Sequence, residues 1–379
     1  GSEMCIRDRW QSVQQLLGIM RQQGGSDMFI TAGFAPAIKQ DGKMTAISQQ
    51  AISPEVSRTL VLSTMNERQR QEFASTNEGN FAISVEGIGR FRVSAFVQQG
   101  KVGMVVRTIT TDIPDLDQLG APPQLKEIVM HKRGLVIMVG ATCSGKSTTL
   151  AAMIGHRNMH SHGHIITIED PVEFIHPHRN CIITQREVGT DTPDWHTALK
   201  NTLRQAPDVI LIGEIRDRET MDHAIAFAET GHLCLATLHA NNSNQALDRI
   251  VNFFPEERRS QLLMDLSLNL RALISQRLVP LKSGQGRCAA VEIMLNSPLV
   301  ADLIGKGQIH EIKEAMKKSR ELGMQTFDQA LFDLIEADRI SIDQALRHAD
   351  SMNDLRLAIK LHSRYAGAGK TNERNLEIL

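Results

Sequence analysis

The sequence predicts an α/β protein in which a small α+β domain precedes a larger domain of alternating strands and helices. In residues 81–97, apolar side chains alternate with polar ones over two consecutive stretches, the pattern of half-buried antiparallel strands. In residues 134–237, short unbroken apolar runs alternate with helical segments, which is typical of a buried parallel sheet. Residues 111–123 lie between these regions, are rich in proline and predict an interdomain linker.

Size and composition agree with a folded protein of two or three domains. The chain has 379 residues, of which 41% are hydrophobic, so disorder along its whole length is excluded. Lys and Arg number 42 and Asp and Glu number 43, which leaves a net charge of −1. Such a balance offers no global attraction to nucleic acid or anionic lipid, and we expect no direct binding of nucleic acid.

The cysteines are dispersed along the chain and contain no C-x-x-C pair, which excludes a zinc site of the paired-cysteine kind. They are Cys5, Cys143, Cys181, Cys234 and Cys288. An odd, dispersed set argues against a disulfide framework and favours a reducing compartment. No apolar run approaches the roughly 18 residues that a membrane span needs. We therefore expect a cytoplasmic protein.

Residues 10–110 form the first predicted domain, which begins with a helical pattern and ends in strands. The alternation places Arg90 and Arg92 on the face opposite Phe91. After a turn, a third strand ends at Arg107. This order of elements predicts a small α+β domain, and the proline-rich linker follows it.

Residues 124–296 form the second predicted domain, a parallel sheet flanked by helices. Its strand candidates are residues 134–139, 164–168, 209–212 and 233–237. A long helix is predicted next from apolar residues at four-residue steps, namely Leu262, Leu266, Leu270 and Ile274. Residues 278–281 and 287–295 then predict a hairpin. Residues 297–365 predict helices, with capping-box signatures beginning at Thr326 and Ser341, and residues 366–379 predict a loose tail.

A phosphate-binding loop is predicted where the first buried strand of the second domain ends and a helix begins. Residues 140–147 fit the pattern G-x-x-x-x-G-K-[ST]. Backbone N–H groups of such a loop surround phosphates, while Lys146 would reach the β- and γ-phosphates and Ser147 would hold Mg²⁺. The ligands are therefore ATP and Mg²⁺. The predicted binding residues are Gly140, Ala141, Thr142, Cys143, Ser144, Gly145, Lys146, Ser147 and Thr148.

Acidic residues follow two further strands of this domain. Glu214 comes directly after the buried strand 209–212 and its glycine, and would either orient Mg²⁺ through water or polarise the attacking water. A second acidic cluster, residues 169–173, follows the strand that ends at Ile168. One of its carboxylates could serve as general base for water, although such a cluster is also common in a plain turn.

Four segments in order resemble the Walker A, Asp box, Walker B and His box of secretion and type IV pilus ATPases. They are GATCSGKST (140–148), ITIEDPVEF (166–174), DVILIGEIRD (208–217) and ETGHLCLATLHANN (229–242). The resemblance is strongest to the PilT/PilU family of pilus retraction ATPases, and more to its PilU branch. The paired-cysteine insert of many assembly and type II secretion ATPases is absent. One departure is Cys143, which stands where the family usually has glycine, and a Cβ there restricts the loop.

The resemblance implies a PAS-like N-terminal domain, a RecA-like ATPase domain and a hexameric ring that binds ATP between them. It makes Glu173 the candidate catalytic carboxylate and Glu214 the Walker B glutamate. His232 and His239 become candidate sensors near the γ-phosphate or a subunit interface, although without the resemblance both would pass as ordinary residues flanking a core strand. The arginines that fit the family's γ-phosphate-reaching arginines are Arg90, Arg92 and Arg107.

The implied function is an ATP-hydrolysing motor that powers type IV pilus retraction and twitching motility. Its partners would be an inner-membrane platform protein of the pilus and a paralogous retraction ATPase, and these partners would hold it at the inner-membrane pilus base. Residues 297–365 would either dock a partner or cap the sheet. Two alternatives remain open: a secretion or DNA-uptake ATPase with the same chemistry, and an accessory subunit that binds ATP but hydrolyses little.

Overall fold

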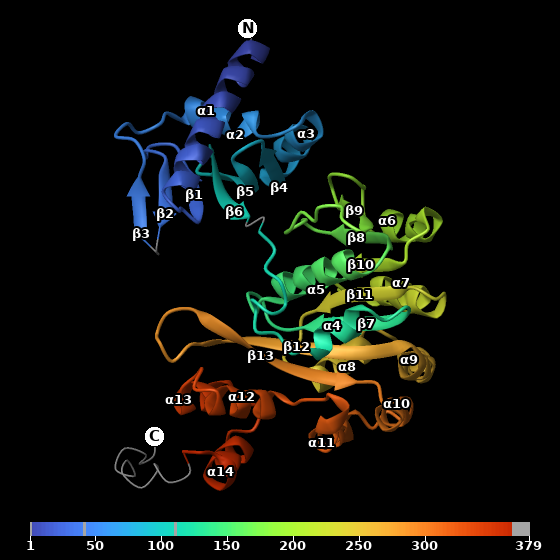
Figure 1. The fold of residues 1–379 in the computed structure, drawn as a ribbon. Helices are drawn as coiled ribbons and strands as arrows, with labels where there is room; N and C mark the ends of the chain where they lie inside the picture. The colour runs from blue at the N-terminus through green and yellow to red at the C-terminus, as the bar shows by residue number, and fades with distance from the viewer. Residues whose placement is uncertain (1, 41–42, 110–111, 366–379) are drawn as a thin grey trace. The chain divides into compact units, whose positions relative to one another are not determined.

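The computed structural model describes residues 2–40, 43–109 and 112–365 (Figure 1). It divides into two compact units, which we call the N-terminal unit (Gly1–Asp112 and Pro171–Ile175) and the P-loop unit (Ile113–Asp170 and His176–Leu379). The predicted tail, residues 366–379, lies outside the described residues, as do residues 110 and 111 at the predicted start of the linker.

The N-terminal unit contains an antiparallel sheet in the order β3-β2-β1-β6-β5-β4 and three helices. The strands are β1 (Asp27–Ile30), β2 (Ala37–Gln40), β3 (Lys43–Ala46), β4 (Glu78–Val85), β5 (Gly89–Gln98) and β6 (Lys101–Ile109). The helices are α1 (Ser2–Gln22), α2 (Pro54–Ser63) and α3 (Glu67–Thr76). Phe91 and Val93 of β5 enter a core that includes Leu17 of α1, whereas Arg92 is exposed. The alternation read from the sequence is thus confirmed.

The P-loop unit is built on a seven-stranded sheet in the order β13-β12-β7-β11-β10-β8-β9. Every neighbouring pair is parallel except β12 with β13. The strands are β7 (Gly134–Val139), β8 (Gly163–Glu169), β9 (Cys181–Glu187), β10 (Val209–Ile212), β11 (Leu233–Leu238), β12 (Leu270–Pro280) and β13 (Arg287–Leu295). The four predicted parallel strands are confirmed, while β9 was not predicted.

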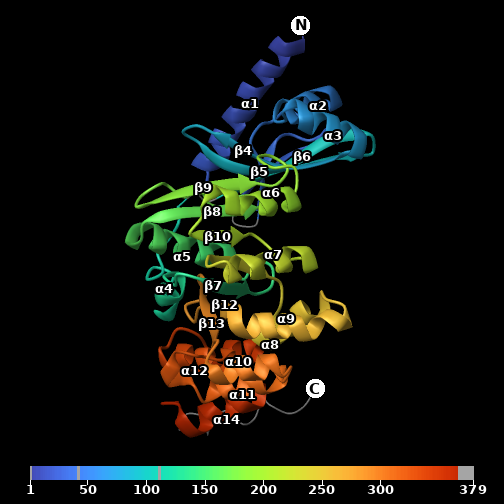
Figure 2. The same cartoon turned by 90° about the vertical axis from the view of Figure 1, so that its right-hand side faces the viewer.

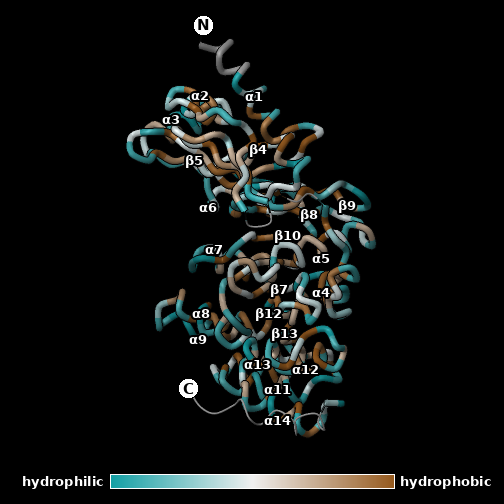
Figure 3. The backbone as a smooth tube through the Cα atoms, turned by 90° about the vertical axis from the view of Figure 1, so that its left-hand side faces the viewer, coloured by the Kyte–Doolittle hydropathy of each residue, from teal (hydrophilic) through white to brown (hydrophobic). Residues whose placement is uncertain are grey.

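Helices cover both faces of this sheet (Figures 1 and 2). One face packs on α6 (Trp195–Thr202), α7 (Arg218–Glu229), α8 (Ser243–Asn252) and α9 (Glu256–Asn269), and the other on α4 (Gln124–Val129) and α5 (Lys146–His160). Side chains of β7 alternate between the two cores, since Ile137 joins the first and Val136 the second. Burial on both faces explains why these strands read as unbroken apolar runs. Figure 3 shows hydrophobic colour along the chain near β10 and β12 and hydrophilic colour on many outer turns.

The predicted long helix through Ile274 is wrong in its second half. Helix α9 ends at Asn269, and both Leu270 and Ile274 belong to β12, which pairs in parallel with β7. A register shift between Leu270 and Ala272 puts Leu270 in the core on one face of the sheet and Ile274 in the core on the other. Apolar residues continue across the junction because β12 is buried on both faces, so their spacing there does not mark a helix.

The C-terminal helices pack on the β12–β13 end of the sheet. They are α10 (Pro298–Gly305), α11 (Ile312–Lys317), α12 (Phe327–Glu336), α13 (Ile342–His348) and α14 (Met352–His362). Phe327 and Leu331 of α12 share a core with Val279 of β12 and Ala290 of β13. The capping box predicted at Thr326 is present. Among the described residues, no helix is long and apolar enough to cross a membrane.

Candidate functional site

Two glycines give the loop between β7 and α5 its close approach to β12. A Cβ at Gly140 would lie 2.8 Å from the carbonyl oxygen of Gln276, and one at Gly145 would lie 2.7 Å from Nε2 of Gln276. Gly145 also has φ +86°, a conformation that L side chains rarely adopt. The close contacts at Gly140 and the positive φ of Gly145 explain why these two positions of the predicted loop are glycine.

Lys146 opens α5 and folds back over the loop. Its Nζ donates hydrogen bonds to the carbonyl oxygens of Gly140 (2.7 Å) and Ala141 (2.8 Å). Because the first N–H groups of a helix have no partner within the helix, this end of α5 favours an anion. Ser147 follows in the same turn and brings a hydroxyl oxygen, a donor that suits Mg²⁺.

Cys143 occupies an exposed position at the top of the loop with φ +62°. For a residue with a Cβ, such a left-handed conformation costs on the order of 1 kcal/mol or more. This left-handed conformation is a physical reason for the glycine that the family usually has at the position of Cys143.

Gln276 supports the loop from β12 and is only 2% exposed. Its Nε2 donates to the carbonyl oxygen of Ser144 (2.9 Å), and its Oε1 accepts from the hydroxyl of Thr149 (2.8 Å). Sequence reasoning missed this residue, because it lies between the predicted helix through Ile274 and the predicted hairpin that begins at residue 278. The parallel pairing of β12 with β7 brings it to the loop from more than a hundred residues away in the sequence.

Glu214 and His239 meet at the same edge of the sheet as the loop, as the motif order predicts. Glu214 follows β10, and its Oε1 lies 3.3 Å from Nε2 of His239, which follows β11. The other carboxylate oxygen, Oε2, accepts a hydrogen bond from Nε of Arg216 (2.7 Å). Burial, and then the nearby positive charge of Lys146, lower the pKa of His239 and favour the neutral ring. Lys146, Glu214 and His239 thus form one polar group.

The second acidic cluster is divided between the two units. Glu169 ends β8 and accepts a hydrogen bond from the Thr167 hydroxyl (2.7 Å), while Asp170 lies 3.9 Å from Arg216. Glu173 is exposed and belongs to Pro171–Ile175, a segment of the N-terminal unit. Within the P-loop unit, the structure therefore does not bring Glu173 together with the loop.

His232 lies at the opposite edge of the sheet. It precedes β11, and its carbonyl oxygen accepts a hydrogen bond from the N–H of Gly134 (3.0 Å), the first residue of β7. Its ring Nδ1 is 3.1 Å from the hydroxyl of Thr230. The loop begins after the last residue of β7, roughly 20 Å away at about 3.3 Å per residue. Within one chain, His232 does not join the group around Lys146.

The three candidate arginines all lie on β5 and β6 of the N-terminal unit. Arg92 on β5 is the cross-strand neighbour of Arg107 on β6, and Arg90 lies two residues before Arg92. Nε of Arg107 donates to Oδ1 of Asp27 on β1 (2.8 Å). Burial alone would raise the pKa of Asp27, but hydrogen bonds from Arg107 and Ser26 lower it. Asp27 thus holds one of these arginines in place.

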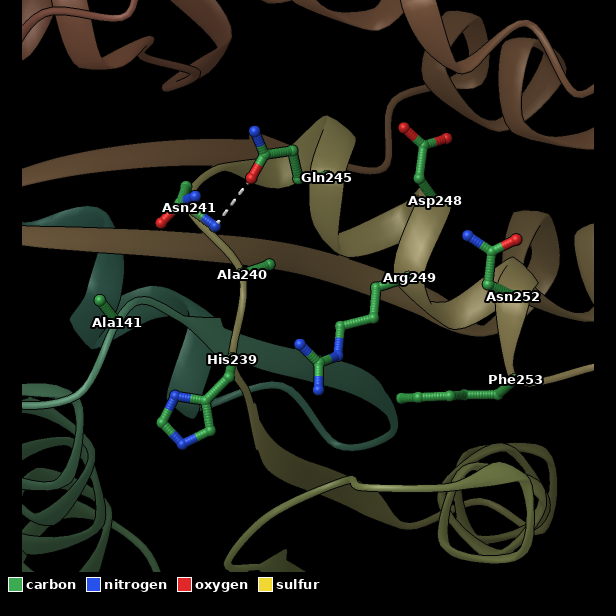
Figure 4. A pocket seen from close by; sticks show the side chains of 9 residues that line it. All are labelled: Ala141, His239, Ala240, Asn241, Gln245, Asp248, Arg249, Asn252 and Phe253. Atoms are coloured by element: carbon green, nitrogen blue, oxygen red, sulfur yellow. Dashed lines mark hydrogen bonds between the residues drawn. The ribbon is translucent and has the colours of Figure 1, made fainter.

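A pocket of about 740 Å³ opens beside the loop in the P-loop unit. It is lined by Ala141, His239, Ala240, Asn241, Gln245, Asp248, Arg249, Asn252 and Phe253 (Figure 4). In Figure 4 the side chain of Arg249 extends from its helix toward the segment that carries His239. The loop thus borders a polar hollow large enough for part of a nucleotide.

Comparison with known proteins gives a consistent result. A family model described as "Type II/IV secretion system protein" matches residues 12–350. The chain is 62% identical over 350 residues to the type IV pilus ATPase PilU of Pseudomonas aeruginosa, covering 92% of each protein. It is 40% identical over 337 residues to the type IV pilus retractation ATPase PilT of the same organism, covering 89% of this chain and 98% of that relative.

A solved structure matches the fold over most of the chain. It is the crystal structure of the pilus retraction motor PilT with bound ADP, with a TM-score of 0.84 and 36% identity over 90% of this chain and 98% of that one. The predicted α/β fold class, with an α+β N-terminal part and a RecA-like P-loop part, is thereby confirmed.

Proposed function

This chain belongs to the family of type II/IV secretion system proteins, and we propose that it is an ATP-hydrolysing motor for the retraction of type IV pili. It is an ATPase, like its relatives, the type IV pilus ATPases PilU and PilT of Pseudomonas aeruginosa. The observation that carries the proposal is the convergence of Lys146, Glu214 and His239 at one edge of the sheet, beside the loop.

The residues present fit ATP and Mg²⁺. Backbone N–H groups at the start of α5 and the ammonium of Lys146 would hold the phosphates. Ser147 and Glu214 supply oxygen donors that suit Mg²⁺, which when bound would neutralise charge on the phosphates. Glu214 would orient the attacking water or a water on the metal, and neutral His239 would fix the position of that carboxylate.

Residues of the N-terminal unit complete the proposed site. Glu173 would act as the catalytic carboxylate, because the Asp-box segment matches the family in that residue. Arg90, Arg92 and Arg107 would stabilise the charge that develops on the γ-phosphate. We keep His232 as a candidate at a subunit interface, since its own chain places it away from the loop.

The proposed assembly is a hexameric ring that passes motion to a pilus platform protein at the inner membrane, with a paralogous retraction ATPase as a further partner. Its proposed domains are residues 10–110, 124–296 and 297–365, with the linker 111–123 and the tail 366–379. The similarity to PilU and PilT supports this assembly.

Turnover of Mg-ATP by the full chain tests the proposal. We expect the turnover rate per chain to rise with protein concentration, because subunits must assemble. We expect Glu214→Gln to abolish turnover. ATP binding should persist in Glu214→Gln. The matched control is Glu257→Gln, the same change at an exposed glutamate in the first turn of α9, which should keep full turnover.

One observation favours the second candidate, an accessory subunit that binds ATP and hydrolyses little. This observation is the left-handed conformation of Cys143 in the loop. If the full chain binds ATP tightly but shows no turnover at any concentration, the autonomous motor is excluded and the accessory subunit takes its place.

A further inference from the structure

A second group of chemically active side chains lies outside the nucleotide site. His196, Glu219 and His223 each present one ligand atom, and these atoms all lie within 4.8 Å of one another. This is the one group of its kind in the part of the chain that the structure describes. None of the three belongs to the motifs discussed above for ATP.

Two neighbouring helices position this group. Glu219 and His223 are four residues apart on α7 and therefore share one side of it, while Met221, Ala224 and Ala228 bury the other side against the sheet. His196 is the second residue of α6, whose N-cap Asp194 accepts a hydrogen bond from Thr197. Helices α6 and α7 cover the same face of the sheet (Figures 1 and 2).

The side chains are already arranged toward one another. Nδ1 of His196 contacts Oε1 of Glu219, and the rings of His196 and His223 lie edge to face with their centres 6.3 Å apart. The ligand atom that His223 presents lies within 4.8 Å of those of His196 and Glu219, and a neutral imidazole offers one ring lone pair to a cation. Asp222 adds a further negative charge nearby.

We propose that His196, Glu219 and His223 bind a divalent cation of the zinc class and that this cation ties α6 to α7. Two imidazoles and a carboxylate match the ligands of Zn²⁺, whereas Mg²⁺ prefers oxygen ligands alone. Ligands of tetrahedral Zn²⁺, at bonds of about 2.1 Å, lie roughly 3.4 Å apart, a spacing that small side-chain rotations reach here. The fourth position stays open to water.

Binding would brace the strand that precedes Glu214. Helix α6 comes before β10 in the chain, and α7 begins four residues after Glu214, so the cation would join the helices that flank β10 in sequence. This is a site distinct from the nucleotide site, and its occupancy can be measured without any turnover.

Titration of the full chain with Zn²⁺, in excess Mg²⁺ and without nucleotide, tests the proposal. We expect the wild-type chain to bind one Zn²⁺. In the double variant His196→Ala/His223→Ala, the affinity for Zn²⁺ should fall at least tenfold. The matched control is His156→Ala/His160→Ala, which also removes two histidines with neighbouring rings, in this case a stacked pair on α5. If the control loses Zn²⁺ as strongly, or if the double variant keeps it, the proposal is wrong.

Stability supplies a second readout that does not depend on the stoichiometry. At a Zn²⁺ concentration a hundredfold above Kd, the unfolding equilibrium constant should fall about a hundredfold. Glu219→Gln should lose most of that shift while keeping the wild-type circular dichroism spectrum, because its side chain is exposed. An equal shift in Glu219→Gln and in the wild-type chain would contradict the assigned ligand set.

Discussion

At the scale of single residues, Cys143 carries the clearest conformational penalty. Its φ of +62° lies in the left-handed region, where glycine has no Cβ to strain. We predict that Cys143→Gly turns over Mg-ATP at the wild-type rate or up to a few-fold faster, because the loop then reaches its phosphate-binding shape without strain. Steady-state turnover at fixed protein concentration measures this.

The control for that substitution is Cys143→Ala, which removes the thiol but keeps the Cβ. If strain is the cause, the alanine variant stays at the wild-type rate while the glycine variant equals or exceeds it. A marked loss of turnover in Cys143→Gly would show that the side chain itself assists the reaction.

His176 predicts a pH dependence of stability. It is buried, and burial lowers its pKa to about 4 from an unfolded value near 6.5. Below pH 6.5 the unfolded chain takes up the proton first, so stability falls as pH decreases toward 4 and the effect is absent above pH 6.5. Between pH 7 and pH 5, this residue should cost about 2 kcal/mol of unfolding free energy.

Urea unfolding at both pH values checks this prediction. Between pH 7 and pH 5, the unfolding free energy of His176→Gln should fall by about 2 kcal/mol less than that of the wild type. His162→Gln, a change at an exposed histidine, should follow the wild type. Identical losses in all three proteins would rule out the assigned role of His176.

The sequence predicted the site residues that belong to local motifs, and it missed Gln276, which belongs to none. Lys146, Glu214 and His239 each follow a buried strand, and parallel strands bring their carboxyl ends to one edge. Gln276 has no such signal, because its role depends on a pairing between β12 and β7 that spacing along the chain does not encode. His232 matched the same family motifs, yet it lies at the opposite edge of the sheet from the loop. Glu173 belongs to the N-terminal unit, and its catalytic role stays a prediction.

At the scale of elements, one carboxylate joins the C-terminal helices to the sheet. Asp350, whose side chain is 7% exposed, accepts from Arg277 of β12 (2.6 Å) and from Lys313 of α11 (2.7 Å). Burial alone would raise the pKa of Asp350, but these two cations lower it. Arg277 in turn stacks over the ring of Phe327 at 4.0 Å.

We predict that Asp350→Asn destabilises the protein by about 3 kcal/mol, because it leaves two partly buried cations without their counter-charge. Chemical denaturation measures the change. Asp338→Asn is the control, since it breaks an exposed ion pair with Lys282 and should destabilise the protein far less than Asp350→Asn. If the two variants lose the same unfolding free energy, then burial of Asp350 is not the cause of its contribution to stability.

At the scale of the whole molecule, composition and element order predicted the α/β class and the two sheets in outline. The short strands β1 to β3 escaped prediction because four-residue segments carry too little periodicity. Strand β9 escaped for a different reason, since polar residues interrupt its apolar pattern near its carboxyl end.

The N-terminal unit is discontinuous in sequence, and this affects how the chain folds during synthesis. Its last segment, Pro171–Ile175, follows the whole phosphate-binding loop and includes Val172, which is 3% exposed. When Asp112 leaves the ribosome, the unit still lacks a piece that emerges about 60 residues later, a delay of several seconds at 5–20 residues per second. The ribosome thus releases β7, α5 and β8 of the P-loop unit before the last segment of the N-terminal unit.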